Sequence, residues 1–232
     1  MRCMRVLLAL LFCLMLLICP VRAAEDDPHL PYLLGYPDGT VRPEAVLHRE
    51  ELAQILFRFL PEQVQDAPEL CWFSDVEPER WSYPAISKTA KLGFLYADTE
   101  GAFHPEASVT GQELALVLTR IANTLNGNTY LPELAESWQE AEISFSAGKG
   151  WVMGLKNGRF DADAGLSRAE TAAILNRLLD RGVDSIDDLL IGMPIFSDNA
   201  DTQKWYFFDV QEAAVAHTCR FDAGAEVWTG LG

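Results

Sequence analysis

Few residues of this chain stand at spacings typical of catalysis. The sequence has no His-Glu-x-x-His zinc motif, no Gly-x-Ser-x-Gly nucleophile elbow and no phosphate-binding loop of the Walker type. Asp161-Ala-Asp163-Ala-Gly165 looks like the start of a calcium loop, but the bidentate acid expected at its twelfth position would fall at Ala172. We therefore expect no enzyme, no cofactor and no metal site.

The N-terminal segment has the pattern of a secretory signal. Two arginines precede an unbroken apolar run, residues 6–19, which is short for a membrane span. Ala23 offers a small residue for cleavage, so we expect residues 1–23 to be removed and the chain to be secreted without stable membrane insertion. A lipoprotein signal ending at Cys19 fits less well, because the bulky Ile18 precedes it.

Cysteine number limits the cross-links and metal sites that can be expected. Three of the five cysteines lie in the predicted signal, which leaves Cys71 and Cys219. Two cysteines provide neither a disulfide framework nor a four-cysteine zinc site. They could form one bridge in an exported protein, and the sequence leaves open whether they are close enough.

Net charge excludes two classes of partner. The chain has 34 acidic and 18 basic residues, a formal charge of −16, and 49% apolar residues. Nucleic acids and anionic lipids are both bound through basic patches, so we expect neither as a partner. The apolar content is that of a globular protein with a core.

Internal repeats organise the sequence. The shift in residue number that relates Trp81 to Trp138 also relates a long run of similar residues without a gap. A partial copy of this repeat lies upstream. Phe196-Ser-Asp and Trp205 repeat the first half of the unit near the C-terminus. We therefore expect residues 29–60 to be the back half of repeat 1, 71–125 to be repeat 2, 135–181 to be repeat 3, and 196–221 to be a half-repeat that completes repeat 1.

Each half-repeat has the pattern of a helix. The back halves, within 49–60, 114–122 and 171–179, carry apolar residues at helical spacing. Thr110-x-x-Glu113 and Ser167-x-x-Glu170 are capping boxes that start two of them. The front halves are expected to be shorter helices at 82–92, 139–149 and 206–216. The predicted fold class is all-α, closed into a ring by the complementary half-repeats.

Three motifs carry a resemblance to a known family. Phe73-Ser-Asp75-Val76, Gly35-Tyr-Pro-Asp38-Gly39 and Ser167-Arg168-Ala169-Glu170 resemble the S-layer homology domain, and the match extends over about residues 29–217. The resemblance implies a pseudo-threefold helical spindle of three tandem helix-loop-helix repeats. It also implies a non-catalytic module that anchors exported proteins to the bacterial cell wall by binding secondary cell-wall polysaccharide, especially its pyruvylated sugar ends, with possible protein cargo.

The resemblance assigns a role to two arginines. Arg49 and Arg168 stand where the family has a groove arginine that binds the acidic sugar, whereas the second copy has Gly111. A guanidinium binds a carboxylate through two charge-assisted hydrogen bonds and glycine does not, so we expect two competent grooves and one degenerate groove. From the residues alone, both arginines could equally be solvated side chains.

Aromatic and turn residues complete the expected grooves. By alignment, the position after each front helix holds Tyr32, Phe94 or Trp151, whose rings could stack on a sugar. Asp38-Gly39 and Asn157-Gly158 would place a polar side chain and an accessible backbone beside them. The further arginines are expected to be structural; they are Arg58, Arg120 and Arg177.

A second function remains open from the sequence. The degenerate second position also fits a structural or protein-interaction component of a bacterial surface assembly that has lost part of its glycan binding. One stoichiometric protein partner, recovered without any cell wall, would distinguish this function from wall anchoring.

Overall fold

The computed structural model describes residues 26–60, 65, 72–125, 146–152, 161–222 and 225–232. The predicted signal, residues 1–23, lies outside this part of the chain. The division of the chain into repeats stays a prediction. In chain order the described elements are β1 (Asp27–His29), α2 (Arg49–Arg58), α4 (Tyr83–Lys91), α5 (Gly111–Leu125), α7 (Arg168–Leu179), a 3₁₀ helix (Ile186–Asp188), α8 (Phe207–Ala214), β2 (His217–Asp222) and β3 (Ala225–Leu231).

The long helices begin at the predicted caps. In α7, the backbone N–H of Glu170 donates to Ser167 Oγ at 3.2 Å, and the Ser167 N–H donates back to the Glu170 carboxylate at 2.8 Å. At the start of α5, the Thr110 hydroxyl accepts a backbone N–H at 3.2 Å. In α2 the His48 N–H donates to Glu51 Oε2 at 3.0 Å. These bonds satisfy amide groups that a helix start otherwise leaves unpaired.

Three segments that precede helices are joined in a ring of backbone hydrogen bonds. The Leu47 N–H donates to Leu166 O at 2.8 Å, the Leu166 N–H to Val109 O at 2.8 Å, and the Val109 N–H to Leu47 O at 2.9 Å. All three side chains are buried. Since buried backbone groups must be paired, this ring fixes the starts of α2, α5 and α7 close together.

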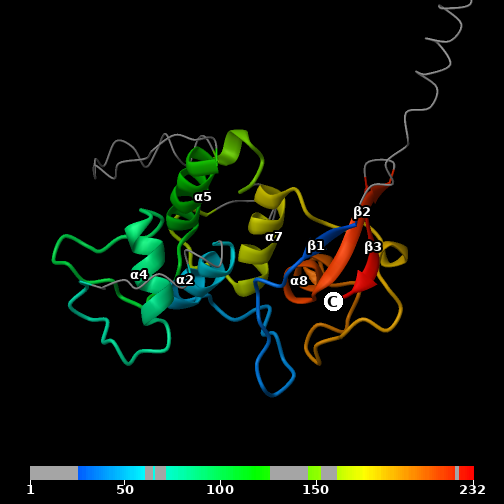
Figure 1. The fold of residues 1–232 in the computed structure, drawn as a ribbon, viewed down its shortest axis with the longest axis horizontal. Coiled ribbons are helices and arrows are strands. Elements are labelled where there is room, and N and C mark those ends of the chain that lie inside the picture. Colours follow the sequence, from blue (N-terminus) through cyan, green and yellow to red (C-terminus); the bar gives the residue numbers. More distant parts are fainter. Residues whose placement is uncertain (1–25, 61–64, 66–71, 126–145, 153–160, 223–224) are drawn as a thin grey trace, which may run out of the picture.

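The main core lies beneath this ring. α2 packs against α4 and α7 packs against α8, and in Figure 1 these helices follow one another from α4 at the left to α8 beside the sheet. The largest side chains that are fully buried in this core are Tyr32, Phe103, Leu33, Leu47, Leu52, Leu56, Ile86, Leu95, Leu114, Leu118 and Ile174. The apolar stripes predicted for the back-half helices therefore face one shared interior.

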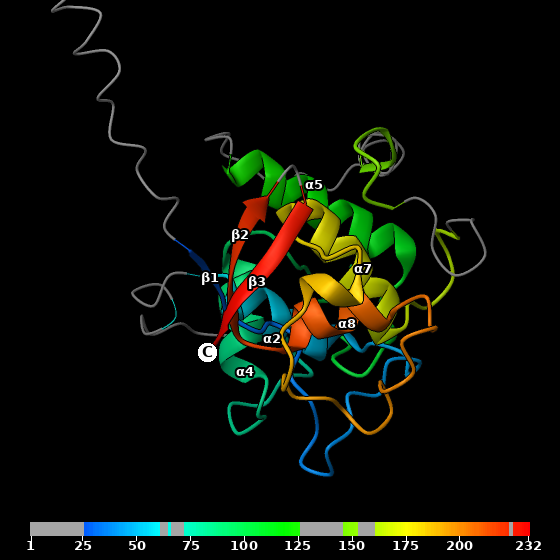
Figure 2. The ribbon, with the colours of Figure 1, turned by 90° about the vertical axis from the view of Figure 1, so that its right-hand side faces the viewer.

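The predicted all-α fold class, a pseudo-threefold spindle closed by half-repeats, is wrong. The described residues contain a three-stranded antiparallel sheet in the order β1-β2-β3, which Figure 2 shows in front of the helices. In its register Pro28 faces Thr218, and Arg220 faces Val227. The physical reason is that Ala225–Leu231 alternates side chains between two faces and includes valine, tryptophan and threonine, which favour strands.

The sheet has a small core of its own. Val183, Leu189, Phe207, Val215, Cys219 and Trp228 form a second buried cluster. The strands therefore cover an apolar surface that α8 and the preceding 3₁₀ segment leave open. Because β1 pairs with β2, the two ends of the described chain are joined.

Candidate functional site

The two arginines predicted to bind a ligand are anchored inside the protein. Arg168 donates from Nε to Val41 O at 2.9 Å, from Nη2 to Leu34 O at 2.7 Å, and from Nη1 to Glu51 Oε1 at 3.0 Å. Only 5% of its side chain is exposed. The alternative that Arg168 is a solvated side chain is therefore wrong.

Arg49 repeats this arrangement at the start of α2. It donates from Nε to Phe103 O at 2.8 Å, from Nη2 to Tyr96 O at 2.7 Å, and from Nη1 to the carboxylate of Glu113. Its side chain is 13% exposed. In both cases the first residue of one helix is joined to the third residue of another helix and to two carbonyl groups of a neighbouring loop.

These contacts define what the guanidinium groups do chemically. A guanidinium has five N–H donors, and each of these two networks uses three nitrogens, with one bond from each. The arginines therefore hold the loops in place before any ligand arrives. Gly111, at the corresponding position of α5, offers no side chain for such a contact.

The structure does not bring the three predicted aromatic side chains to one surface. Tyr32 is 1% exposed, and its hydroxyl donates to Asn176 Oδ1 at 2.5 Å. Phe94 is also buried, whereas Trp151 is half-buried. Of the three, Trp151 is therefore placed to offer a ring face to a ligand.

The second set of arginines has the predicted structural role. Each donates from Nη1 to the carbonyl of the residue at the aromatic position: Arg58 to Tyr32 O at 3.3 Å, Arg120 to Phe94 O at 3.4 Å, and Arg177 to Trp151 O at 3.2 Å. The aromatic positions are thus fixed through their backbone, which confirms the sequence-based interpretation of these arginines.

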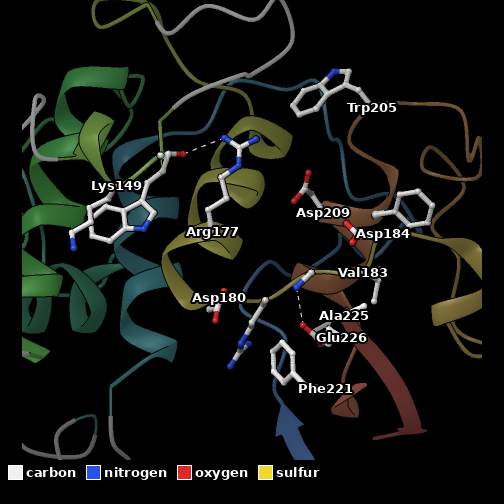
Figure 3. Close-up of a pocket in the computed structure, with 15 residues that line it drawn as sticks. Lys149, Arg177, Asp180, Val183, Asp184, Trp205, Asp209, Phe221, Ala225 and Glu226 are labelled. Carbon is white, nitrogen blue, oxygen red and sulfur yellow. Dashed lines mark hydrogen bonds between the residues drawn. The ribbon is translucent and has the colours of Figure 1, made fainter. Parts of the chain in front are cut away.

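Trp151 lines a pocket of about 510 Å³ between the end of α7 and the sheet (Figure 3). Its wall includes Arg177 and Arg181, together with the aromatic ring of Trp205. The Nη1 atom of Arg181 is buried and has no hydrogen-bond partner among the described residues. The remaining wall combines charged, aromatic and small apolar residues and comprises Lys149, Gly150, Asp180, Gly182, Val183, Asp184, Phe208, Asp209, Phe221, Ala225 and Glu226.

Such a wall suits a polyhydroxylated ligand with an acidic group. Indole rings cover the apolar face of a sugar, carboxylates accept hydrogen bonds from hydroxyls, and guanidinium groups bind a carboxylate. Arg181 also lines a second pocket, of about 480 Å³, beside Tyr32 and Arg58. The guanidinium-bearing residue Arg181 therefore lines both pockets.

Asp38 and Gly39 lie outside the larger pocket. The Asp38 carboxylate accepts from the Thr40 hydroxyl at 2.6 Å, from the Thr40 N–H at 3.0 Å and from Arg42 at 3.0 Å, and these bonds lower the pKa of Asp38 to about 2. Gly39 has a φ of 79°, a left-handed conformation that favours glycine. Asn157 and Gly158 lie outside the described residues.

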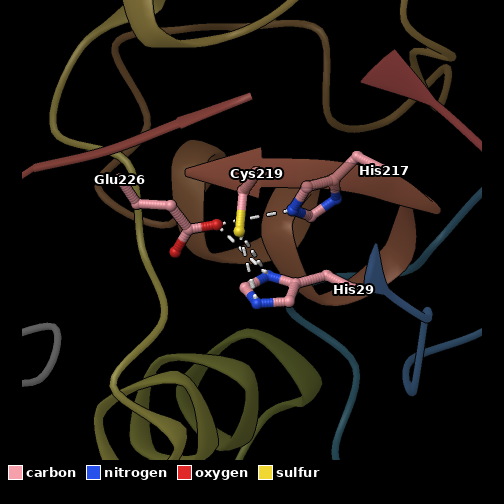
Figure 4. Close-up of side chains that lie close together, drawn as sticks. All are labelled: His29, His217, Cys219 and Glu226. Atoms are coloured by element: carbon pink, nitrogen blue, oxygen red, sulfur yellow. Dashed lines mark hydrogen bonds and ion pairs between the residues drawn. The ribbon is translucent and has the colours of Figure 1, made fainter. Parts of the chain in front are cut away.

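Sequence reasoning missed a second group of chemically active side chains. His29, His217, Cys219 and Glu226 converge in the sheet (Figure 4). The available signal was weak, because His217 and Cys219 are two residues apart, as on one face of a strand, but that strand was not predicted.

The part of the chain that the structure describes holds no helix with the length and hydropathy needed to cross a membrane.

Comparison with known proteins identifies the family of one segment. In the helical part of the chain, capped helices meet at their starts. Residues 73–115 match the S-layer homology domain. The predicted resemblance is therefore confirmed for this segment.

Several known proteins are similar to most of the chain. It is 27% identical over 212 residues to cell surface glycoprotein 1 of Acetivibrio thermocellus, covering 85% of this chain and 9% of that protein. It is 27% identical over 207 residues to the cellulosome-anchoring protein of the same organism, covering 85% and 45%. An amylopullulanase of Thermoanaerobacterium thermosulfurigenes is 27% identical over 156 residues, covering 63% and 8%. The chain thus spans less than half of each of these relatives.

Proposed function

We propose that this chain is a non-catalytic anchoring module of a bacterial cell surface. The match of residues 73–115 to the S-layer homology domain carries the proposal. The names of two relatives, a cell surface glycoprotein and a cellulosome-anchoring protein, support it. The amylopullulanase is covered over only 8% of its length, so the similarity to an enzyme does not bring a catalytic activity to this chain.

The ligand we propose is an anionic cell-wall polysaccharide with pyruvylated sugar ends. The pocket beside Trp151 offers a half-buried indole for stacking, and Arg177 and Arg181 in its wall are the cations that we assign to a carboxylate. Because the whole chain carries a formal charge of −16, these local cations are needed to attract an anion.

Arg49 and Arg168 act mainly by positioning in this proposal. Their hydrogen bonds hold the loops that contain Tyr96 and Leu34, so that each groove wall is formed before a ligand binds. Their remaining N–H groups are the donors that we assign to a ligand carboxylate. The other residues predicted to bind the glycan stay part of the proposal; they are Tyr32, Phe94, Asp38, Gly39, Asn157 and Gly158.

Sedimentation with purified cell walls tests the proposal. The chain without its predicted signal, residues 24–232, should sediment with walls and stay in solution when the wall polysaccharide has been removed. Trp151→Ala should weaken retention by about tenfold, the loss of one stacking contact worth about 1–1.5 kcal/mol. Trp81→Ala is the matched control, because Trp81 is 57% exposed and does not line the pocket.

Each outcome has a defined meaning. Equal retention of the unsubstituted chain on intact and stripped walls would contradict glycan binding, and would favour the structural or protein-interaction function. Equal losses for Trp151→Ala and Trp81→Ala would contradict the proposed pocket while leaving wall binding in place.

A further inference from the structure

Four buried side chains from three strands meet at one point in the sheet. His29 comes from β1, His217 and Cys219 from β2, and Glu226 from β3. One donor atom from each lies within 4.8 Å of all the others, and Figure 4 shows the four groups turned toward one another. All four residues are at most 5% exposed.

The separations between these donor atoms match those around a small tetrahedral ion. Metal bonds of about 2.0–2.3 Å place neighbouring ligand atoms about 3.3–3.8 Å apart. His29 Nδ1 lies 3.7 Å from Cys219 Sγ and 3.2 Å from Glu226 Oε1. His217 Nε2 lies 3.5 Å from Glu226 Oε1. The cluster therefore needs little adjustment to surround an ion.

Hydrogen bonds outside the cluster orient two of its members. His217 Nδ1 lies 2.8 Å from Val215 O, a contact in which the ring N–H donates and Nε2 is left as an acceptor. Glu226 Oε2 accepts the backbone N–H of Gly182 at 2.7 Å, which leaves Oε1 facing the cluster. Such outer bonds fix the tautomer and direction of metal ligands.

The two atoms that face inward make ion-pair contacts but no well-aligned hydrogen bond. His217 Nε2 and Glu226 Oε1 are buried and have no hydrogen-bond partner among the described residues, although His217 Nε2 lies 3.2 Å from Glu212 Oε2 and Glu226 Oε1 lies 3.2 Å from His29 Nδ1. Glu212 adds a second buried carboxylate, whose Oε1 lies 2.9 Å from His29 Nδ1 and whose Oε2 accepts from Trp228 Nε1. Acceptors this close together in a dry interior need a cation between them.

Either protons or a metal ion can supply that positive charge. Burial lowers the pKa of His217, but the carboxylates of Glu212 and Glu226 outweigh burial and raise it to about 9, so protons are one way to fill the cluster. Cys219 distinguishes the two. A thiol contributes only a weak hydrogen bond to a histidine–carboxylate proton network, here between Cys219 Sγ and His29 Nε2 at 3.4 Å, whereas a thiolate is a strong ligand for zinc.

We propose that His29, His217, Cys219 and Glu226 bind one divalent transition-metal ion, with zinc as the best match to two imidazoles, a thiolate and a carboxylate. The ion holds β1 against the β2–β3 hairpin and so joins the first and last strands of the described chain. Since Glu226 also lines the pocket beside Trp151, the ion fixes one wall of that pocket.

Cobalt substitution tests the metal site directly. Every described contact lies within residues 26–232, so the chain without its predicted signal, residues 24–232, keeps them all. This protein, treated with a chelator and titrated with Co²⁺, should take up one ion per chain. It should show the visible bands of a tetrahedral site and a near-ultraviolet thiolate-to-cobalt band. Zinc should displace the cobalt, and elemental analysis of the untreated protein should find one zinc per chain.

Two cysteine variants assign the thiolate. The predicted mature chain has only two cysteines, so Cys71→Ser should retain the thiolate band and Cys219→Ser should lose it, with zinc affinity at least about tenfold weaker. If Cys219→Ser fails to fold, the band in Cys71→Ser makes the assignment alone. A chain that takes up no cobalt, or whose thiolate band disappears in Cys71→Ser, would overturn the proposal and leave a proton-filled cluster.

Discussion

Arg168 at the start of α7 donates to Glu51 in the first turn of α2 at 3.0 Å, although 117 residues separate them. Arg49 at the start of α2 binds Glu113 of α5 in the same way. Each bond joins the beginning of one helix to the beginning of another. Together with the backbone ring at Leu47, they make the helix starts the most heavily connected part of the helical region.

Arg168→Ala should destabilise the protein strongly. The substitution leaves Glu51 and two carbonyl groups without their guanidinium partner in a buried place, which costs about 3–5 kcal/mol. Urea denaturation of both proteins measures the difference. Arg42→Ala is the matched control, because Arg42 pairs with Asp38 at the surface and its loss should change the midpoint little. Similar effects of the two substitutions would show that the Arg168 network does not brace the helices.

Gly39→Ala should cost about 1–2 kcal/mol of unfolding free energy. Nothing stands within 4 Å of a Cβ built at Gly39, so the cost comes from its left-handed φ of 79° and not from a clash. Gly39→Asn should cost less, because asparagine tolerates that conformation. Gly148 is an equally open glycine without a positive φ, so Gly148→Ala should be neutral or slightly stabilising. Thermal unfolding of the three variants measures these differences. An unchanged stability of Gly39→Ala would contradict backbone strain at this position.

Asp98 should make part of the stability depend on acid pH. Its hydrogen bonds, first from the Ala102 N–H and then from His104, lower the pKa of Asp98 to about 2 from an ordinary value of 3.8. Because the pKa of Asp98 is lower in the folded state than in the unfolded state, the ionised carboxylate stabilises the folded protein. This contribution is fully present above pH 4. It is lost as the pH falls from about 4 through about 2.

Asp98→Asn should therefore be less stable than the unsubstituted chain at pH 7, and the difference should shrink toward pH 2. Urea midpoints measured between pH 2 and pH 7 provide the comparison. Asp26→Asn removes one exposed carboxylate and so controls for the change in net charge. A stability difference for Asp98→Asn that stays constant with pH would contradict the role of this carboxylate.

The helices could be predicted because their signals are local. Apolar spacing and the Ser167–Glu170 capping box placed α7, and the same reasoning placed α2 and α5. These patterns act within one or two turns of chain, so no knowledge of distant contacts is needed.

The sheet was missed because its signals were short or assigned elsewhere. β1 has three residues, and its partner strand begins at His217, far along the chain. Residues 196–221 had been assigned to a helical half-repeat, although the alternation in 225–231 was available as a strand signal. The cluster around Cys219 could not be found without these strands, because pairing is what brings His29 to it.

The burial of the Arg49 and Arg168 side chains also could not be predicted from the sequence. Arg168 and Arg49 stand in first turns where exposure is common, and their partners Leu34 and Phe103 are distant in the chain. Only the packed structure shows that the guanidinium groups are enclosed. The groove position that the resemblance assigns to these arginines stays a prediction, and the structure shows that they brace two loops.

Calorimetric titration with a purified wall-polysaccharide fragment tests anchoring most directly. The fragment should be used with its pyruvyl groups intact and after their removal by mild acid. We expect residues 24–232 to bind the intact fragment, and to bind the depyruvylated one at least about tenfold more weakly, because a charge-assisted hydrogen bond contributes about 1.5–3 kcal/mol. Equal affinity for both fragments, or no heat with either, would contradict recognition of a sugar acid by this chain.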